Sequence, residues 1–142
     1  MKVFFDTNIL IDVFTNRDKE CEFSIFCYRL VQRNLIKGYI NAKQLSDIYY
    51  VVHKMLDKET AIECINVLSQ QFEVVPYTKY DLINENNYSF NDIEDGSIDY
   101  CSKLYCCDYL LTRNKKHFNN AKSLVMIPKD FIELYKVFEK NS

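Results

Sequence analysis

The chain has few glycines and prolines, two of each in 142 residues, and it contains no internal repeat, linker or low-complexity segment. It also has no excess of charge of either sign, since 18 Lys and Arg face 20 Asp and Glu, which argues against a generally basic nucleic-acid-binding surface. No apolar run approaches the roughly 20 residues of a membrane span. Asp6 interrupts the N-terminus before the apolar region of a signal peptide can form. We therefore expect a cytoplasmic protein without a membrane segment.

The composition predicts one folded domain over residues 1–142. Aromatic residues make up 15% of the chain and apolar residues 48%, which is the opposite of the composition of disordered proteins. A chain of this length buries roughly 70% of its unfolded surface, so it needs neither disulfides nor a structural metal to hold a core.

The cysteines do not form a recognisable framework. There is no CxxC pair among the six, and only two histidines are present, so the spacing of zinc ligands is absent. We expect reduced thiols, mostly buried, at Cys21, Cys27, Cys64, Cys101, Cys106 and Cys107.

Apolar patterning predicts alternating strands and helices. Short apolar runs predict strands at residues 2–5, 39–40, 72–75, 109–111 and 125–127. Apolar residues at helical spacing predict helices at about residues 18–36, 42–56, 61–68, 92–105 and 128–138, with Gly38 as the stop of the first. This order indicates an α/β domain with a mostly parallel sheet.

Two polar residues follow predicted strands. Asp6 ends the first strand, and Asn114 lies shortly after the strand at residues 109–111. If the two strands are parallel, both residues lie at the same edge of the sheet, where α/β proteins bind their ligands. Alone, an Asp in this place is better explained as a turn residue or a helix cap than as a ligand-binding residue.

The segment 91–99 gathers acidic residues on a predicted helix. Asp92, Asp95 and Asp99 recur at i, i+3 and i+7 and therefore share one face, although like charges at this spacing are unfavourable. A capping box of Asn91 and Glu94 would explain the first turn but not Asp99. A divalent cation held by Asp95 and a neighbour would relieve the repulsion.

A further carboxylate, Asp47, lies at the start of the apolar run 48–52. A carboxylate in an apolar setting needs either a lysine or a metal ion as its partner, and the sequence leaves both open.

The densest basic stretch is residues 112–117, Thr-Arg-Asn-Lys-Lys-His. It is either a solvated loop or, beside a cluster of carboxylates, a contact for a phosphate backbone.

Four blocks together resemble the motifs of the PIN domain family, in the branch of small bacterial proteins that includes the VapC toxins. They are Phe-Asp-Thr-Asn-Ile-Leu at 5–10, Ser-Asp-Ile-Tyr-Tyr at 46–50, Asp-Ile-Glu-Asp at 92–95 and Tyr-Leu-Leu-Thr-Arg-Asn-Lys-Lys-His-Phe at 109–118. The resemblance covers essentially the whole chain. It implies a three-layer α/β/α domain with a parallel sheet of four or five strands.

The resemblance also implies a metal-dependent endoribonuclease that uses Mg²⁺ or Mn²⁺. Asp6 and Asp95 match the two principal metal-binding acids, Asp47 falls where a third acid is expected, and Asn114 falls where many members have a fourth Asp. These four residues are the predicted catalytic set. Oxygen ligands suit either ion, which would lower the pKa of a bound water and offset charge on the phosphate.

Around that set the resemblance assigns supporting roles. The residues expected to hold the ligands in place are Thr7, Asn8, Glu94 and Asp99, and those expected to bind RNA are Arg113, Lys115 and Lys116. The expected partners are RNA, a second copy of the chain and an antitoxin protein.

Two alternatives belong to other functional classes. Asn114 and His117 stand where an Asp is frequent in this family, and the missing charges point to a degenerate, non-catalytic domain that binds RNA or a protein. A phosphotransfer enzyme with Asp6 as nucleophile is the second alternative, but such enzymes need another acid at the position of Asn8.

Overall fold

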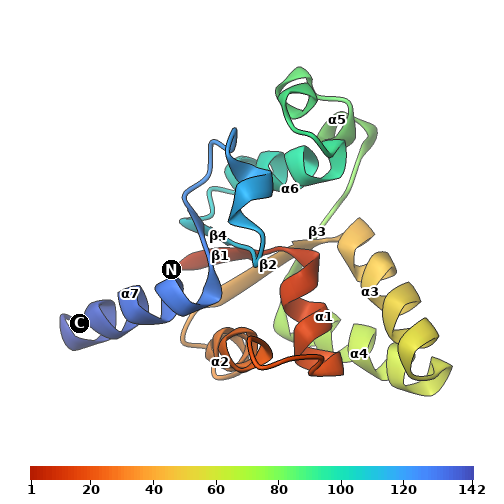
Figure 1. Ribbon diagram of the computed structural model, residues 1–142, viewed down its shortest axis with the longest axis vertical. Coiled ribbons are helices and arrows are strands. Elements are labelled where there is room, and N and C mark those ends of the chain that lie inside the picture. The colour runs from red at the N-terminus through yellow and green to blue at the C-terminus, as the bar shows by residue number, and fades with distance from the viewer.

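A five-stranded, wholly parallel β-sheet forms the centre of the computed structural model, which describes residues 1–142 (Figure 1). Its strand order is β3-β2-β1-β4-β5. The strands are β1 (Lys2–Phe5), β2 (Lys37–Asn41), β3 (Glu73–Val75), β4 (Tyr109–Leu111) and β5 (Val125–Met126). The sheet confirms the predicted α/β class, and all five predicted strands are present.

Helices cover both faces of the sheet (Figure 1). One face carries α1 (Thr7–Thr15), α2 (Cys21–Gln32), α3 (Ala42–Met55), α4 (Lys58–Gln71) and α7 (Pro128–Lys140). The other carries α6 (Ile93–Leu104) and the short helices α5 (Lys79–Leu82), η1 (Glu85–Ser89) and η2 (Lys115–Phe118). The molecule therefore has three layers, as the resemblance implies.

Strand β1 shows why both faces need a cover. Val3, Phe4 and Phe5 are all fully buried. Because side chains alternate along a strand, Val3 and Phe5 pack into the larger apolar cluster on the side of α1 to α4, whereas Phe4 packs into the smaller one beside α6. A continuous apolar run is the pattern of a central parallel strand.

Several element boundaries differ from the predicted ones. The helix predicted at 18–36 spans only Cys21–Gln32, because Asn34 takes a left-handed backbone conformation with φ of 59° and ends the helical geometry. The prediction that Gly38 stops this helix is wrong. Gly38 lies in β2, where an added Cβ would come within 2.5 Å of the Phe72 ring, so the absence of a side chain permits close packing.

The cysteines are free thiols, as predicted, and four of the six are buried. None of the helices combines the length and the apolar character required to cross a lipid bilayer.

The chain connections bring several helix starts to one edge of the sheet. Helices α1 and α3 begin directly after β1 and β2, at the carboxyl ends of these strands. β1 also pairs with β4 in parallel register, and the Asp6 amide continues the ladder by donating to the Leu111 carbonyl at 2.8 Å. Residues that follow β1, β2 and β4 therefore meet at the same edge.

Candidate active site

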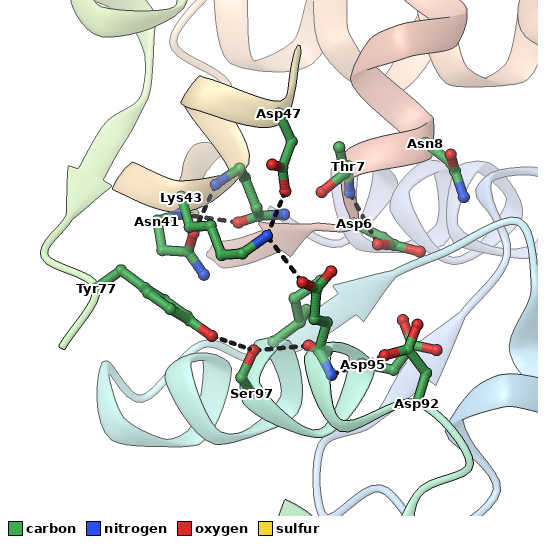
Figure 2. A pocket seen from close by; sticks show the side chains of 13 residues that line it. Asp6, Thr7, Asn8, Asn41, Lys43, Asp47, Tyr77, Asp92, Asp95 and Ser97 are labelled. Atoms are coloured by element: carbon green, nitrogen blue, oxygen red, sulfur yellow. Dashed lines mark hydrogen bonds and ion pairs between the residues drawn. The ribbon is translucent and has the colours of Figure 1, made fainter. Parts of the chain in front are cut away.

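An acidic pocket lies at this edge, between the starts of α1, α3 and α6 (Figure 2). Its lining is largely polar, with only two hydrophobic residues among thirteen. The carboxylates in the lining are Asp6, Asp47, Asp92, Glu94 and Asp95, and the other residues are Thr7, Asn8, Asn41, Lys43, Gln44, Tyr77, Ser97 and Ile98. The pocket thus collects five acids from three separate segments of the chain.

Asp6 is held rigidly at the bottom of this arrangement. Its Oδ1 accepts a hydrogen bond from the Thr7 amide at 2.8 Å, and its Oδ2 accepts one from the Thr112 hydroxyl at 2.7 Å. The Asn114 amide donates to the same Thr112 hydroxyl at 3.1 Å. The residue is only 5% exposed, and this burial raises the pKa of Asp6 although both hydrogen bonds act to lower it. A buried, fixed carboxylate without a cationic partner in contact suits the binding of a cation.

Asp95 approaches from the first turn of α6. Burial, followed by the charges of Asp6 and Asp92, raises the pKa of Asp95 to about 6. The imidazole Nδ1 of His117 lies 3.8 Å from its Oδ2 and partly opposes this effect when protonated. The geometry therefore places Asp95 where the charge of Asp6 makes its ionisation less favourable, and a positive charge beside these carboxylates would relieve that cost.

The start of α6 differs in detail from the prediction. The capping residue is Asp92, whose Oδ1 accepts from the Glu94 amide at 2.9 Å, so the predicted capping box of Asn91 and Glu94 is wrong. Gly96 permits this placement, since an added Cβ would lie 2.7 Å from the Asn87 Cα in η1.

Lys43 spans the pocket between α3 and α6 (Figure 2). Its Nζ lies 2.8 Å from Asp47 Oδ2 and 3.0 Å from Glu94 Oε1. Of the two partners that the sequence left open for Asp47, the structure shows the lysine. The pairing with Asp47 is an i, i+4 contact along α3, a spacing visible in the sequence, whereas the contact with Glu94 depends on the packing of α6.

The oxygen-only chemistry of Asp6 and Asp95 fits a hard divalent cation such as Mg²⁺ or Mn²⁺. No group of three or more His, Cys, Asp or Glu side chains lies close enough together to hold an ion. The arrangement therefore offers a pair of carboxylates, with the remaining ligands left to water, and this is the usual way in which Mg²⁺ is bound.

The expected supporting residues divide into two groups. Thr7, Asn8 and Glu94 line the pocket. Asp99 does not: its carboxylate accepts hydrogen bonds from the backbone amides of Lys122 and Ser123, at 3.0 and 2.9 Å. The third acid of the predicted helix face is thus used to fix the segment that leads into β5.

Asn114 also lies outside the pocket lining. It is exposed, and its contribution to the site is the amide that supports Thr112. Thr112 is not among the predicted site residues, although it directly follows β4, whose pairing with β1 brings it opposite Asp6.

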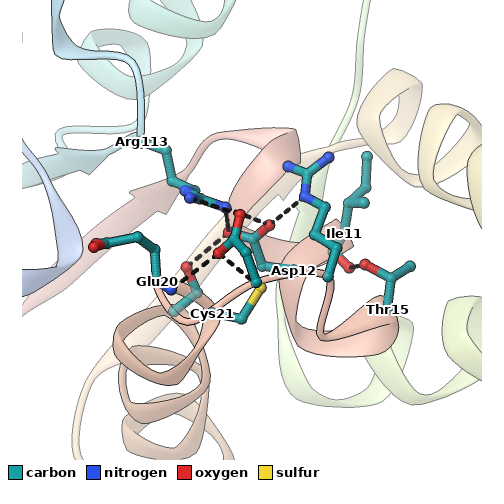
Figure 3. A network of polar contacts seen from close by, with 9 residues as sticks. Ile11, Asp12, Thr15, Glu20, Cys21 and Arg113 are labelled. Atoms are coloured by element: carbon teal, nitrogen blue, oxygen red, sulfur yellow. Dashed lines mark hydrogen bonds and ion pairs between the residues drawn. The ribbon is translucent and has the colours of Figure 1, made fainter.

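Arg113 does not face the pocket either. Its guanidinium contacts both oxygens of Asp12, at 3.0 and 3.1 Å, and Asp18 at 3.1 Å (Figure 3). Asp12 is fully buried in α1 and also pairs with Arg17 at 2.8 Å. The expectation that Arg113 contacts RNA is therefore not supported by its placement, because its charge is used within the fold. Lys115 and Lys116 of the same stretch are exposed.

Comparison with known protein families places this pocket in context. The model of the PIN domain matches residues 2–116. The chain belongs to the PIN domain family. The matched region contains all four predicted catalytic residues of this PIN domain, together with the whole pocket lining.

Individual proteins resemble the chain over most of its length. The chain is 26% identical over 137 residues to Ribonuclease VapC1 of Aquifex aeolicus (strain VF5), covering 93% of this chain and 94% of that protein. Its fold is similar to FitAcB from Neisseria gonorrhoeae, with a TM-score of 0.67 at 17% identity over 89% and 98% of the two chains. It is also similar to a toxin-antitoxin complex from Klebsiella pneumoniae, with a TM-score of 0.63 at 19% identity over 89% and 97%.

Proposed function

We propose that this PIN domain is a metal-dependent endoribonuclease that hydrolyses RNA phosphodiester bonds. The observation that carries the proposal is the pair Asp6 and Asp95 at the carboxyl edge of a PIN sheet, where burial raises the pKa of both groups and the charge of Asp6 raises that of Asp95 further. The name of the Aquifex relative, a ribonuclease matched over almost its whole length, supports the substrate class.

In this proposal Asp6 and Asp95 hold one Mg²⁺ or Mn²⁺ ion. When bound, the cation supplies a lowered pKa for a water molecule and a positive charge beside the phosphate. Thr7 and Thr112 keep the Asp6 carboxylate in a fixed orientation through their two hydrogen bonds. Asp47 is engaged by Lys43, so only Asp6 and Asp95 are proposed as direct ligands.

The proposed RNA contacts are Lys115 and Lys116. Both are exposed and belong to η2, the same short helix as His117, which lies against Asp95. Two exposed ammonium groups in the same short helix as His117 suit contacts with phosphate groups, which position a nucleic acid without selecting its sequence.

The biological setting belongs to the same proposal. The similarity to a toxin-antitoxin complex supports the role of a toxin that an antitoxin protein restrains. Assembly as a homodimer and a cytoplasmic location, where RNA substrates are found, complete the proposal.

The test is cleavage of a structured RNA by the purified protein, with Mn²⁺ and with EDTA. We expect cleavage by the parent with Mn²⁺ alone and loss of at least about a hundredfold in rate in Asp6→Asn and Asp95→Asn, since each loses a charged ligand. Asp130→Asn, on the exposed first turn of α7, is the matched control. Circular dichroism must show that each variant is folded.

Two results would contradict the proposal. If both pocket variants cleave at the parental rate, the assignment of the site is wrong. If the folded parent cleaves no RNA with Mn²⁺, the catalytic proposal fails and a domain that only binds RNA or a protein remains.

A further inference from the structure

Lys43 is the only lysine among the residues that line the acidic pocket, which include no arginine or histidine. Its ammonium group is held by two ion pairs. It joins Asp47, one turn further along α3, to Glu94, in the first turn of α6 (Figure 2). Its side chain is one-third exposed, so the two contacts form at the mouth of the pocket rather than in the core. One ammonium therefore bridges one acid on each of two opposite walls and offsets one of their two negative charges.

The position of Lys43 along its helix is unfavourable without these acids. It is the second residue of α3, where the positive end of the helix dipole disfavours a cation. Partial burial acts to lower the pKa of Lys43, yet the hydrogen bonds to Asp47 and Glu94 raise it overall. Lys43 is thus a permanent positive charge, held in place by the pocket acids.

Three acids of the pocket, Asp6, Asp92 and Asp95, have no lysine or arginine partner. Asp92 is exposed and caps α6 through the Glu94 amide, whereas Asp6 is buried and Asp95 is half-buried. The exposed imidazole of His117 lies 3.8 Å from Asp95. No three acids of the pocket lie close enough together to hold an ion as a group.

We propose that Lys43 takes the place of a second divalent cation and limits the pocket to one ion, bound by Asp6 and Asp95. This inference rests on the proposed metal-dependent function. A second ion at Asp47 or Glu94 would have to displace the Lys43 ammonium from its two contacts or lie beside it. A divalent cation bound to the same carboxylate as the ammonium would be repelled by it, because both carry positive charge. Asp47 then serves to fix Lys43 and is not a metal ligand.

The test is the number of Mn²⁺ ions bound, measured by calorimetric titration and by the electron paramagnetic resonance signal of free Mn²⁺. Lys43→Met removes the charge and keeps most of the side-chain volume, while Lys43→Arg keeps the charge. Lys54→Met, an exposed residue near the end of the same helix, is the matched control. We expect one ion in the parent, Lys43→Arg and Lys54→Met, and two ions in Lys43→Met.

A second variant tests Asp47 without touching the lysine. Asp47→Asn is expected to bind one ion with an affinity within about threefold of the parent, because the carboxylate is not a ligand. A loss of about tenfold or more would make Asp47 a ligand and overturn the inference.

The remaining outcomes separate this inference from the function on which it rests. Two ions in the parent, or a single ion in folded Lys43→Met, would overturn the role of Lys43 and leave the metal-dependent function standing. No Mn²⁺ binding to the parent at millimolar concentrations would overturn both.

Discussion

Replacing Asp95 with Asn should stabilise the metal-free protein at neutral and alkaline pH, although it removes a proposed metal ligand. The pKa of Asp95 is raised by burial and by the neighbouring charges of Asp6 and Asp92, so ionisation of this carboxylate is costly in the folded chain. Asn has nearly the same shape and carries no charge. The variant therefore avoids the cost that the parent meets as Asp95 loses its proton.

The size of this stabilisation follows from the pKa of Asp95. A rise of this pKa from its ordinary value of 3.8 to about 6 corresponds to roughly 3 kcal/mol of unfolding free energy, at about 1.4 kcal/mol for each pKa unit. The side chain is 17% exposed, and solvent screening reduces the expected effect to about 1–2 kcal/mol.

The direction with pH is fixed by linkage. A carboxyl whose pKa is higher in the folded than in the unfolded chain gives its full stabilisation below the unfolded value, near 4, and loses it as the pH rises through about 6. The unfolding free energy of Asp95→Asn should therefore exceed that of the parent only slightly at about pH 4. The difference should grow to about 1–2 kcal/mol near pH 7 and then stay constant.

The assay is urea unfolding followed by circular dichroism in EDTA, at several values between about pH 4 and pH 8, with Asp130→Asn as the exposed control. Added Mn²⁺ should stabilise the parent more than Asp95→Asn, because a ligand that binds only the folded state shifts the unfolding equilibrium. An advantage of the variant that does not change with pH, or a parent more stable than the variant at pH 8 in EDTA, would refute the reasoning.

Three further substitutions separate residues that hold the fold from residues that act in the pocket. Asp99→Ala leaves two backbone amides without their acceptor and should cost about 2–4 kcal/mol in urea unfolding; a pocket role would instead appear as slower cleavage by the folded protein. Arg113→Met leaves the buried Asp12 with Arg17 as its one ion-pair partner, beside the hydroxyl of Ser24, and should cost about 2–4 kcal/mol of unfolding free energy. RNA binding in a filter assay should not weaken, and weaker binding at unchanged stability would restore the RNA-binding role. Gly96→Ala places a Cβ 2.7 Å from a backbone atom of η1 and should cost about 1–3 kcal/mol of unfolding free energy. It should also slow cleavage, because the clash displaces the start of α6. A variant as stable as the parent would show that η1 moves without strain.

The sequence predicts the sheet and its active edge well because both depend on local patterns. A buried parallel strand needs an uninterrupted apolar run, and residues 2–5 supply one. The first polar residue after such a run lies at the carboxyl end of the strand, so Asp6 and the end of β4 could be placed together before the fold was known. The short helices α5, η1 and η2 escaped prediction because they are four or five residues long and have no apolar period to detect.

Side-chain partners could not be predicted in the same way. Sequence spacing places Asp92, Asp95 and Asp99 on one helix face, yet the first two line the pocket and the third binds the segment before β5. A helix face of two turns is long enough to meet two different neighbours, and spacing along the helix does not say where one neighbour ends. Arg113 turns away from the pocket for a related reason, because a fully buried Asp12 requires a cation more than an exposed phosphate contact does.

The distribution of charge, rather than its sum, decides what the pocket attracts. The chain carries nearly equal numbers of acids and bases, but five acids and one lysine line the pocket, and Arg113 and Arg17 are bound to Asp12. The bare pocket is therefore strongly negative and repels a phosphate, so an RNA strand can approach only where a cation offsets that charge. Lys43 supplies part of this offset permanently, and the divalent ion proposed at Asp6 and Asp95 would supply two further positive charges. In the proposed function, metal binding and RNA binding are therefore coupled by electrostatics, and net charge is a poor guide to either.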